Sequence, residues 1–469
     1  MTVPTGPTGP GTGISGSAPS TPRHVLAPLA LAQFICSFAG SNMNVMINDI
    51  SADLDTTVQG VQLAITIFLL VMAALMIPGG KLTDRIGRKR CLVAGLTVYG
   101  VGALLSAVAP GLGVLILGNS ILEGVGTALL IPPVYILTTL YFTDTTARAR
   151  AFGVIMALGG VGAAAGPLIG GLITSGLSWR AAFVFQALVV AVIVLLSRRI
   201  ADPLPPDPTR PFDTGGAVLS AVGLILVVAG ILAADDNGWL MAGLLLLGAL
   251  VLAAFFRWIR ARERAGREPL LSTELFRDRT SNLGLLTQNL QWMILMGVSF
   301  VVAAYLQVVR GYDAIRTGVL FTAATAGLLA ASLAAERFAK RRTPRTLVMT
   351  GFAVTAGGIG TLLAMANGSP SAWASTPGLL LIGLGLGVML TPSVNVVQSS
   401  FPEEQQGEIS GLSRSVSNLG SSLGTAIAGT ILVADLAFGS YAAALIVLAA
   451  VGCVGFVAAM LLPRERAAR

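Results

Sequence analysis

One carboxylate interrupts a long apolar stretch of this sequence. Glu123 lies with Asn119 inside the apolar run 112–141. A charged side chain inside a bilayer is costly, so we expect Glu123 to face a cavity or a partner. Because a partly desolvated carboxylate can exchange a proton near neutral pH, Glu123 is our candidate for proton coupling. The alternative is a structural carboxylate that hydrogen bonds to a neighbouring helix.

Other reactive residue types are too few for enzymatic chemistry. The chain has one histidine, His24, and three cysteines, Cys36, Cys91 and Cys453. They offer no metal-ligand spacing, disulfide framework or catalytic triad, and no Gly-x-x-x-x-Gly-Lys-Ser/Thr phosphate loop occurs. We therefore expect a protein that is not an enzyme and that uses no cofactor and no metal.

The composition is that of a membrane protein with many spans. Of 469 residues, 54% are hydrophobic and only 11% are charged, with a mean hydropathy of +0.81. A soluble protein could not solvate such a surface. The net charge of +8 comes from short loops between apolar runs and not from one patch. This distribution argues against a nucleic-acid partner and for a lipid bilayer.

The distribution of lysine and arginine predicts the topology. With a cytoplasmic N-terminus and every apolar run spanning, only Arg180, Arg310 and Arg316 of the 30 basic residues lie outside. The positive-inside rule therefore favours fourteen transmembrane helices with both termini in the cytoplasm of a cell-membrane protein. The apolar runs are 26–48, 58–79, 91–109, 112–141, 151–174, 180–197, 214–234, 238–256, 283–308, 314–335, 346–366, 376–400, 406–433 and 438–462.

An internal repeat divides the chain. The pattern Gly124-x-Gly126-x6-Pro133 recurs 259 residues later as Gly383-x-Gly385-x6-Pro392. Parallel repeats of this kind build transporters with a binding site between two halves. We predict an all-α membrane protein with five segments. These are a disordered cytoplasmic tail at 1–24, a six-helix half at 25–200, a linker with two inserted helices at 201–281, a second six-helix half at 282–463, and a cytoplasmic tail at 464–469.

The loop at 80–90, between the second and third runs, combines glycines and an acid with five basic residues. Its pattern, Gly-x-Leu-x-Asp-Arg-x-Gly-Arg-Lys, resembles the signature loop of the major facilitator superfamily of secondary transporters. The resemblance implies that Asp84 lies at the cytoplasmic contact between the halves. A basic loop that only obeys the positive-inside rule would not explain the glycines and the acid. The gating residues that the resemblance implies are Gly80, Asp84, Arg85, Gly87 and Arg88.

A glycine-rich run at 151–174 carries a second motif. Glycines at four-residue spacing let a neighbouring backbone approach, and a proline among them bends the helix. The run resembles the Gly-x3-Gly-Pro-x-x-Gly-Gly motif of facilitator antiporters, which that family ties to export; a generic packing seam is the alternative. The arrangement of six, two and six helices resembles the fourteen-helix drug:proton antiporter branch. The motif residues are Gly162, Gly166, Pro167, Gly170 and Gly171.

The fourth run departs from the facilitator pattern Arg-x-x-Gln-Gly-x-Gly. Ser120 stands in place of the arginine and Glu123 in place of the glutamine. The family's proton-relay arginine therefore cannot be transferred to this chain, and Glu123 remains the candidate for proton coupling.

Amides and one aromatic residue are candidates for a substrate cavity. A few polar groups beside an aromatic ring suit amphiphilic ligands, although hydrogen bonding between helices would explain them as well. Arg414 lies about two turns inside its run, and we expect it to extend toward the cytoplasm. The candidate cavity residues are Asn42, Asn44, Asn119, Gln288, Asn289, Gln291, Trp292 and Asn395.

Together these features predict a monomeric, proton-coupled exporter of hydrophobic or amphiphilic small molecules that works by alternating access. One alternative is a facilitator of a metabolite or sugar, which the scarcity of charge in the expected cavity disfavours. Another is a membrane receptor or scaffold of transporter ancestry, which would need neither the signature loop nor an embedded acid.

Overall fold

The computed structural model describes residues 23–203, 205–209, 211–234, 237–339, 342–366, 371–401 and 405–463. Every regular element within these residues is a helix, as the sequence predicts. Most of the two expected tails, at 1–22 and 464–469, lies outside the described residues.

The first group of helices is called the N half below. Short helical turns interrupt its first and fourth spans. Its elements are α1 (Arg23–Asn42), η1 (Met43–Val45), α2 (Ile47–Asp53), α3 (Val58–Ile86), α4 (Arg88–Ala107), α5 (Leu112–Leu115), η2 (Ile116–Glu123), α6 (Gly124–Tyr141), α7 (Thr145–Gly176) and α8 (Trp179–Ser197).

Two helices, α9 (Thr214–Leu232) and α10 (Gly238–Arg264), and the short turn η3 (Thr273–Phe276) connect this group to the C half. The elements of the C half are α11 (Arg279–Ala304), η4 (Tyr305–Val309), α12 (Ala314–Ala339), α13 (Pro344–Ala366), η5 (Ala372–Ser375), α14 (Thr376–Gln398), α15 (Gln406–Val433) and α16 (Phe438–Met460).

The number of possible membrane spans agrees with the prediction. Thirteen helices within the described residues are long and apolar enough to cross a bilayer. The two parts of α7, Arg150–Ala163 and Ala165–Gly176, meet at 42° and make a fourteenth span if they are counted together. Pro167 explains this bend, because its ring nitrogen cannot donate a hydrogen bond to the preceding turn.

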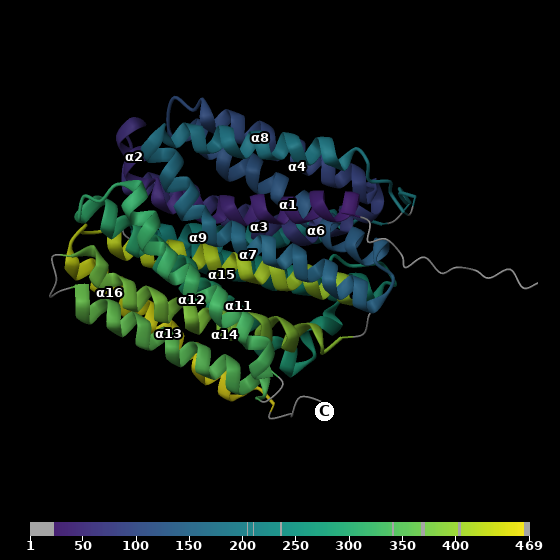
Figure 1. Cartoon of the computed structure of the whole chain (residues 1–469). Helices are drawn as coiled ribbons and strands as arrows, with labels where there is room; N and C mark the ends of the chain where they lie inside the picture. Colours follow the sequence, from purple (N-terminus) through teal and green to yellow (C-terminus); the bar gives the residue numbers. More distant parts are fainter. Residues whose placement is uncertain are drawn as a thin grey trace, which may run out of the picture.

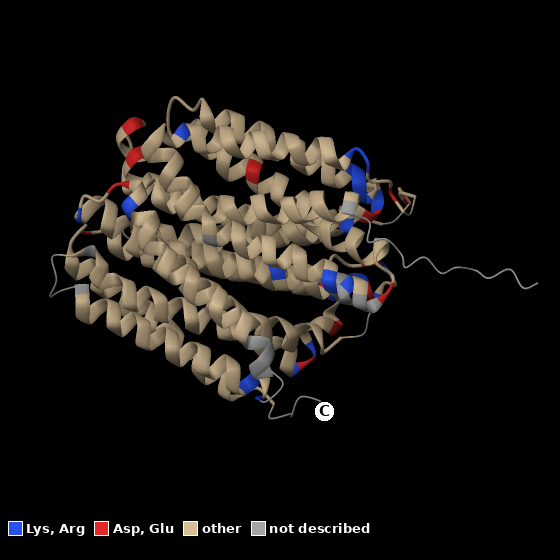
Figure 2. Cartoon of the chain, in the orientation of Figure 1, with Lys and Arg blue, Asp and Glu red and all other residues tan. Residues whose placement is uncertain are grey.

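The two halves lie side by side with their long helices running between the same two ends of the molecule (Figure 1). Lysine and arginine gather at the end where α3 passes into α4 (Figure 2). We call this end, marked by Arg85, Arg88, Lys89 and Arg90, the basic end, and the other the opposite end. Glycine contacts within the halves follow the sequence repeat.

The repeated glycines have the same role in each half. A Cβ atom added to Gly126 of α6 would lie 2.7 Å from the Gly95 carbonyl oxygen of α4. One added to Gly385 of α14 would lie 2.6 Å from the Gly351 carbonyl oxygen of α13. Both distances are too short for a methyl group, so each glycine allows the same pair of helices to pack backbone against backbone.

The inserted helix α9 covers the boundary between the halves. Val228 of α9 packs with Leu70 of α3 and Ala426 of α15, and all three are buried. The insertion therefore contacts both halves and is not attached to one of them alone.

Candidate functional site

The first seam between the halves joins α3 to α15 over most of their length. Gln62 of α3 donates hydrogen bonds from Nε2 to the carbonyl oxygens of Thr425, at 3.2 Å, and Ala426, at 3.1 Å. About one turn further along α3, Ser422 Oγ donates to the Thr66 carbonyl oxygen at 3.1 Å. Each of these bonds runs from a side chain of one half to a backbone oxygen of the other, so they join the two helices directly.

The same seam continues to the basic end. Ser415 Oγ donates to the Ala73 carbonyl oxygen. Lys81 Nζ then lies 2.6 Å from Glu408 Oε1 of α15 and 2.9 Å from Glu268 Oε1, which follows α10. One ammonium group therefore links the N half, the C half and the inserted segment.

The signature loop is anchored beside this ion pair. Gly87 has φ +105°, a conformation that favours glycine, and a Cβ there would approach Asp202 Oδ2 at 3.0 Å. Arg88 Nη2 lies 2.8 Å from Asp84 Oδ1, and the Asp84 carbonyl oxygen accepts from Asp207 N at 3.3 Å. The loop thus packs on the segment after α8. Lys81, which was not among the predicted gating residues, makes an ion pair with the C half.

Two further residues of the implied gating set have lesser contacts. Arg85 is exposed at the basic end. A Cβ added to Gly80 would meet only the Pro132 side chain, at 3.8 Å, so the geometry here does not demand glycine.

The glycine motif of α7 serves two interfaces. Gly162 and Gly166 face α1, where an added Cβ would collide with the Phe34 carbonyl oxygen and with Ser41 Oγ. Gly170 continues this face, with its Cβ position 3.0 Å from Asn42 Cβ. The four-residue spacing therefore packs α7 on α1 within the N half.

The second seam between the halves joins α7 to α12. A Cβ on Gly171 would lie 2.6 Å from the Ala314 carbonyl oxygen, and one on Gly318 would collide with the Pro167 carbonyl oxygen. Ile315 N also donates to Ser175 Oγ at 3.1 Å. This seam therefore combines close backbone approach at Gly171 and Gly318 with the hydrogen bond to Ser175.

A glutamine closes the opposite end. Gln307, in the π-helical turn η4, donates from Nε2 to the Asn44 carbonyl oxygen at 2.7 Å and accepts from Asn48 N at 3.2 Å. Asn44 contributes its backbone to this contact, while its own buried Oδ1 has no partner among the described residues.

The predicted amides of α11 hold the C half together. Ser413 Oγ donates to Gln288 Oε1 at 2.7 Å, and Asn289 Nδ2 donates to the Val416 carbonyl oxygen of α15 at 2.9 Å. Gln291 is likewise tied to α14, because its Oε1 accepts from Ser393 Oγ at 3.0 Å. Their contacts therefore correspond to the alternative of interhelical hydrogen bonding.

The other candidate cavity residues lie apart from these amides. Trp292 is half-buried and Asn395 is exposed. Asn42 and Asn119 are buried, and the side-chain nitrogen of each has no partner among the described residues.

Glu123 is sealed inside the N half. It is the last residue of the π-helical turn η2 and is fully buried. Its neighbours are Tyr99 of α4 and Cys36 of α1. The Tyr99 hydroxyl donates to Gln186 Oε1 of α8, and neither Glu123 oxygen has a hydrogen-bond partner among the described residues. Because an unpaired buried carboxylate is costly when ionised, this conformation suits the protonated acid.

Arg414 of α15 reaches into the N half, which sequence analysis did not predict. Its Nη2 donates to the Tyr135 hydroxyl of α6, and its guanidinium lies 5.4 Å from the centre of that ring. Tyr135 donates in turn to Gln33 Oε1 of α1 at 3.1 Å. The expected extension toward the cytoplasm is wrong, because the side chain is held by the other half.

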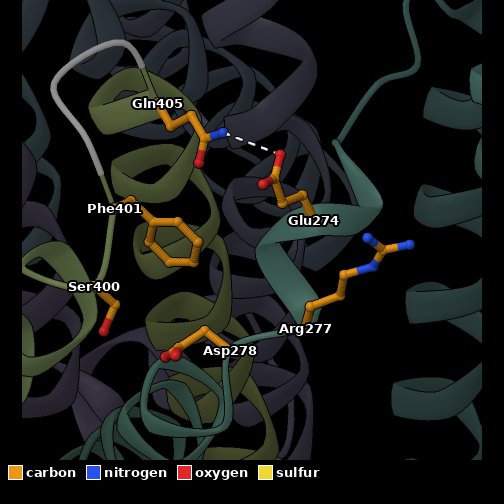
Figure 3. A pocket seen from close by; sticks show the side chains of 6 residues that line it. All are labelled: Glu274, Arg277, Asp278, Ser400, Phe401 and Gln405. Carbon is orange, nitrogen blue, oxygen red and sulfur yellow. Dashed lines mark hydrogen bonds between the residues drawn. The ribbon is translucent and has the colours of Figure 1, made fainter.

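A pocket lies at the basic end, away from both embedded charges. It is formed between the segment before α11 and the connection from α14 to α15, and Gln405 Nε2 donates there to Glu274 Oε2 at 3.3 Å (Figure 3). Its lining residues are Glu274, Arg277, Asp278, Ser400, Phe401 and Gln405.

Known proteins resemble this chain over most of its length. One is the puromycin resistance protein pur8 of Streptomyces alboniger, 31% identical over 87% of this chain and 81% of that protein. Another is the multidrug efflux pump LfrA of Mycolicibacterium smegmatis, 30% identical over 79% of this chain and 73% of that protein.

The structural comparison supports the same fold. A crystal structure of the peptide transporter POT in complex with sulfate superposes with a TM-score of 0.68, covering 93% of each chain at 17% identity. The model of the Major Facilitator Superfamily matches residues 29–234 and again 212–425. The resemblance noted in the signature loop is thereby confirmed: this chain belongs to the Major Facilitator Superfamily, in its multidrug branch.

Proposed function

We propose that this protein is a proton-coupled exporter of hydrophobic or amphiphilic small molecules. The relatives named for puromycin resistance and multidrug efflux support export as the direction of transport. The basic end would face the cytoplasm under the positive-inside rule, which places both termini there. A monomer with the halves 25–200 and 282–463 would suffice, since the two seams lie within one chain.

The observation that carries the coupling proposal is the isolated carboxylate of Glu123. It is fully buried, unpaired among the described residues, and ends a π-helical turn, a feature that often marks functional sites. The Tyr99 hydroxyl beside it can turn from Gln186 toward an ionised carboxylate. Glu123 would hold a proton in one conformation and release it in another.

The two seams supply the moving parts of this mechanism. Opening the basic end requires the Lys81–Glu408 ion pair to separate, whereas opening the opposite end requires Gln307 to leave Asn44. Rocking of one half against the other would break these contacts in alternation.

Transport in proteoliposomes tests the proposal. Substrates are first identified with a panel of hydrophobic dyes and antibiotics, puromycin included, in a host without its own pumps. We expect an imposed pH gradient to drive their accumulation in the acidic compartment above the external concentration, and a protonophore to abolish it. Accumulation that stops at equal concentrations, or that ignores the protonophore, would contradict proton-coupled export and favour the facilitator alternative.

A further inference from the structure

The guanidinium of Arg414 lies deep in the helical bundle. Arg414 is eight residues into α15, about 12 Å from its start at 1.5 Å per residue. It is joined through Tyr135 to Gln33, which lies ten residues, or about 15 Å, into α1. The cation therefore lies within the helical bundle, about 12–15 Å in from the basic end.

Its hydrogen-bonding capacity is only partly used. A guanidinium group has five N–H donors, and the contacts of Arg414 to Tyr135 and Met156 both use Nη2. Nε and Nη1 make no hydrogen bond to any residue that the structure describes. Arg414 is half-buried, so the residue is not fully enclosed by the protein. A cation at this depth requires an anionic or strongly accepting partner.

Apolar and aromatic groups lie beside this cation. The Tyr135 ring stacks on Phe152 of α7 with 6.0 Å between ring centres. Met156 Sδ lies 4.0 Å from Arg414 Nη2, and Met156 is 46% exposed. A flexible thioether beside two rings is a surface that accepts varied apolar shapes.

Glu123 cannot form a corresponding site for a cationic ligand. It has no exposed surface, whereas Arg414 is partly exposed. A ligand between the halves would therefore meet a positive charge and not a negative one.

We propose that Arg414, Tyr135 and Gln33 form an acceptor site for amphiphiles that carry an acidic group, such as a carboxylate, sulfonate or phenolate. The acidic group pairs with the guanidinium fork, which matches planar oxyanions in geometry. The apolar body of the ligand packs on Tyr135, Phe152 and Met156. This inference rests on the proposed export function and adds the charge of the preferred substrate.

Two fluorescent probes with the same ring system test the site. 1-Anilinonaphthalene-8-sulfonate carries the acidic group, and N-phenyl-1-naphthylamine lacks it. Binding is titrated to the full-length protein in nanodiscs, with empty nanodiscs subtracted. We expect Arg414→Gln to weaken binding of the sulfonate about tenfold and to change binding of the neutral amine less than about twofold, because only the sulfonate needs the cation.

Three further variants control the result. Arg414→Lys keeps the charge without the fork and should fall between wild type and Arg414→Gln. Tyr135→Phe keeps the ring and should weaken sulfonate binding a few-fold. Arg260→Gln removes an exposed arginine of α10 and should change neither probe. Retained binding of the neutral amine shows that each variant is folded.

The outcomes separate this inference from the export proposal. Wild type that binds no sulfonate, or Arg414→Gln that weakens both probes equally or neither, would overturn the acceptor site. Binding does not depend on a proton gradient. A protein that binds the sulfonate through Arg414 but transports nothing would contradict the proposed function and leave the acceptor site standing.

Discussion

The two halves share a backbone scaffold but not their embedded charges. By the 259-residue offset of the repeat, Glu123 in the N half corresponds to Ile382 in the C half. The glycines of α7 recur in α15 at an offset of 258 residues. By this offset Arg414 in the C half corresponds to Met156 in the N half. Each half therefore carries one embedded charge where the other has an apolar residue.

The placement of these charges differs as much as their sign. Glu123 is sealed among helices of its own half, while Arg414 crosses to the other half and touches Met156, its own counterpart. The difference fits the two proposed roles, in which the sealed acid holds a proton and the partly exposed arginine cation meets a ligand. The glycine contacts that the halves share would serve only as scaffold.

A third asymmetry lies at the basic end. Glu408 pairs with Lys81 there, but by the same offsets their counterparts are Arg150 and Lys340. Two basic residues cannot form an ion pair with each other, so the counterparts of Lys81 and Glu408 cannot close the α7–α12 seam in the same way.

The largest expected effect comes from removing the sealed charge. We expect Glu123→Gln to abolish accumulation driven by a pH gradient while binding of N-phenyl-1-naphthylamine stays within about twofold of wild type, since the amide keeps the shape but cannot exchange a proton. The matched control is Ile382→Gln, an amide at the corresponding position of the C half. Loss of coupling in the control but not in Glu123→Gln would reverse the assigned roles of the halves.

A smaller effect should follow when the shared scaffold is altered. A Cβ on Gly162 would collide with the Phe34 carbonyl oxygen, and one on Gly420 with that of Asn289. We expect Gly162→Leu and Gly420→Leu each to destabilise the protein by about 1–3 kcal/mol, the usual cost of overpacking. Thermal unfolding in detergent measures this. A marked loss in only one variant would show that the glycine contacts of the halves are not equivalent.

The smallest effect concerns the ion pair of the seam. Lys81 and Glu408 are partly exposed, so their pairing should be worth about 1 kcal/mol or less, or up to about fivefold in the equilibrium between open and closed basic end. We expect Lys81→Gln to increase labelling of a cysteine introduced at Ala73 from the basic side. The exchange Lys81→Glu with Glu408→Lys should restore part of the protection. If Lys81→Gln left the labelling unchanged, the ion pair would not hold the basic end closed.

The helical framework was predictable because long apolar runs and short basic loops leave few alternatives. The glycines that repeat as Gly126 and Gly385 make equivalent helix contacts in the two halves. The hydrogen-bond partners of polar side chains were harder to predict from the sequence, since they depend on which helices from distant parts of the chain become neighbours. Gln288 and Gln291 have the composition of a cavity lining, yet each bonds to a serine of a neighbouring helix.

One overlooked signal was present in α15. Glu408, Ser415, Ser422 and Gly429 recur every seven residues, which places them on one helical face. Each of them meets α3, and a Cβ on Gly429 would lie 2.5 Å from the Gln62 side chain. The direction of Arg414 had no such signal, because it depends on the position of Tyr135 in the other half.

Proton release on substrate binding tests the central claim most directly. The solubilised protein is held in weak buffer near neutral pH, and a transported substrate is added while the pH is recorded. We expect wild type and Ile382→Gln to release protons, because substrate binding favours the conformation in which Glu123 is ionised. Glu123→Gln should release none although it binds the substrate. Proton release from Glu123→Gln equal to that of wild type would contradict the assignment of Glu123 as the coupling group.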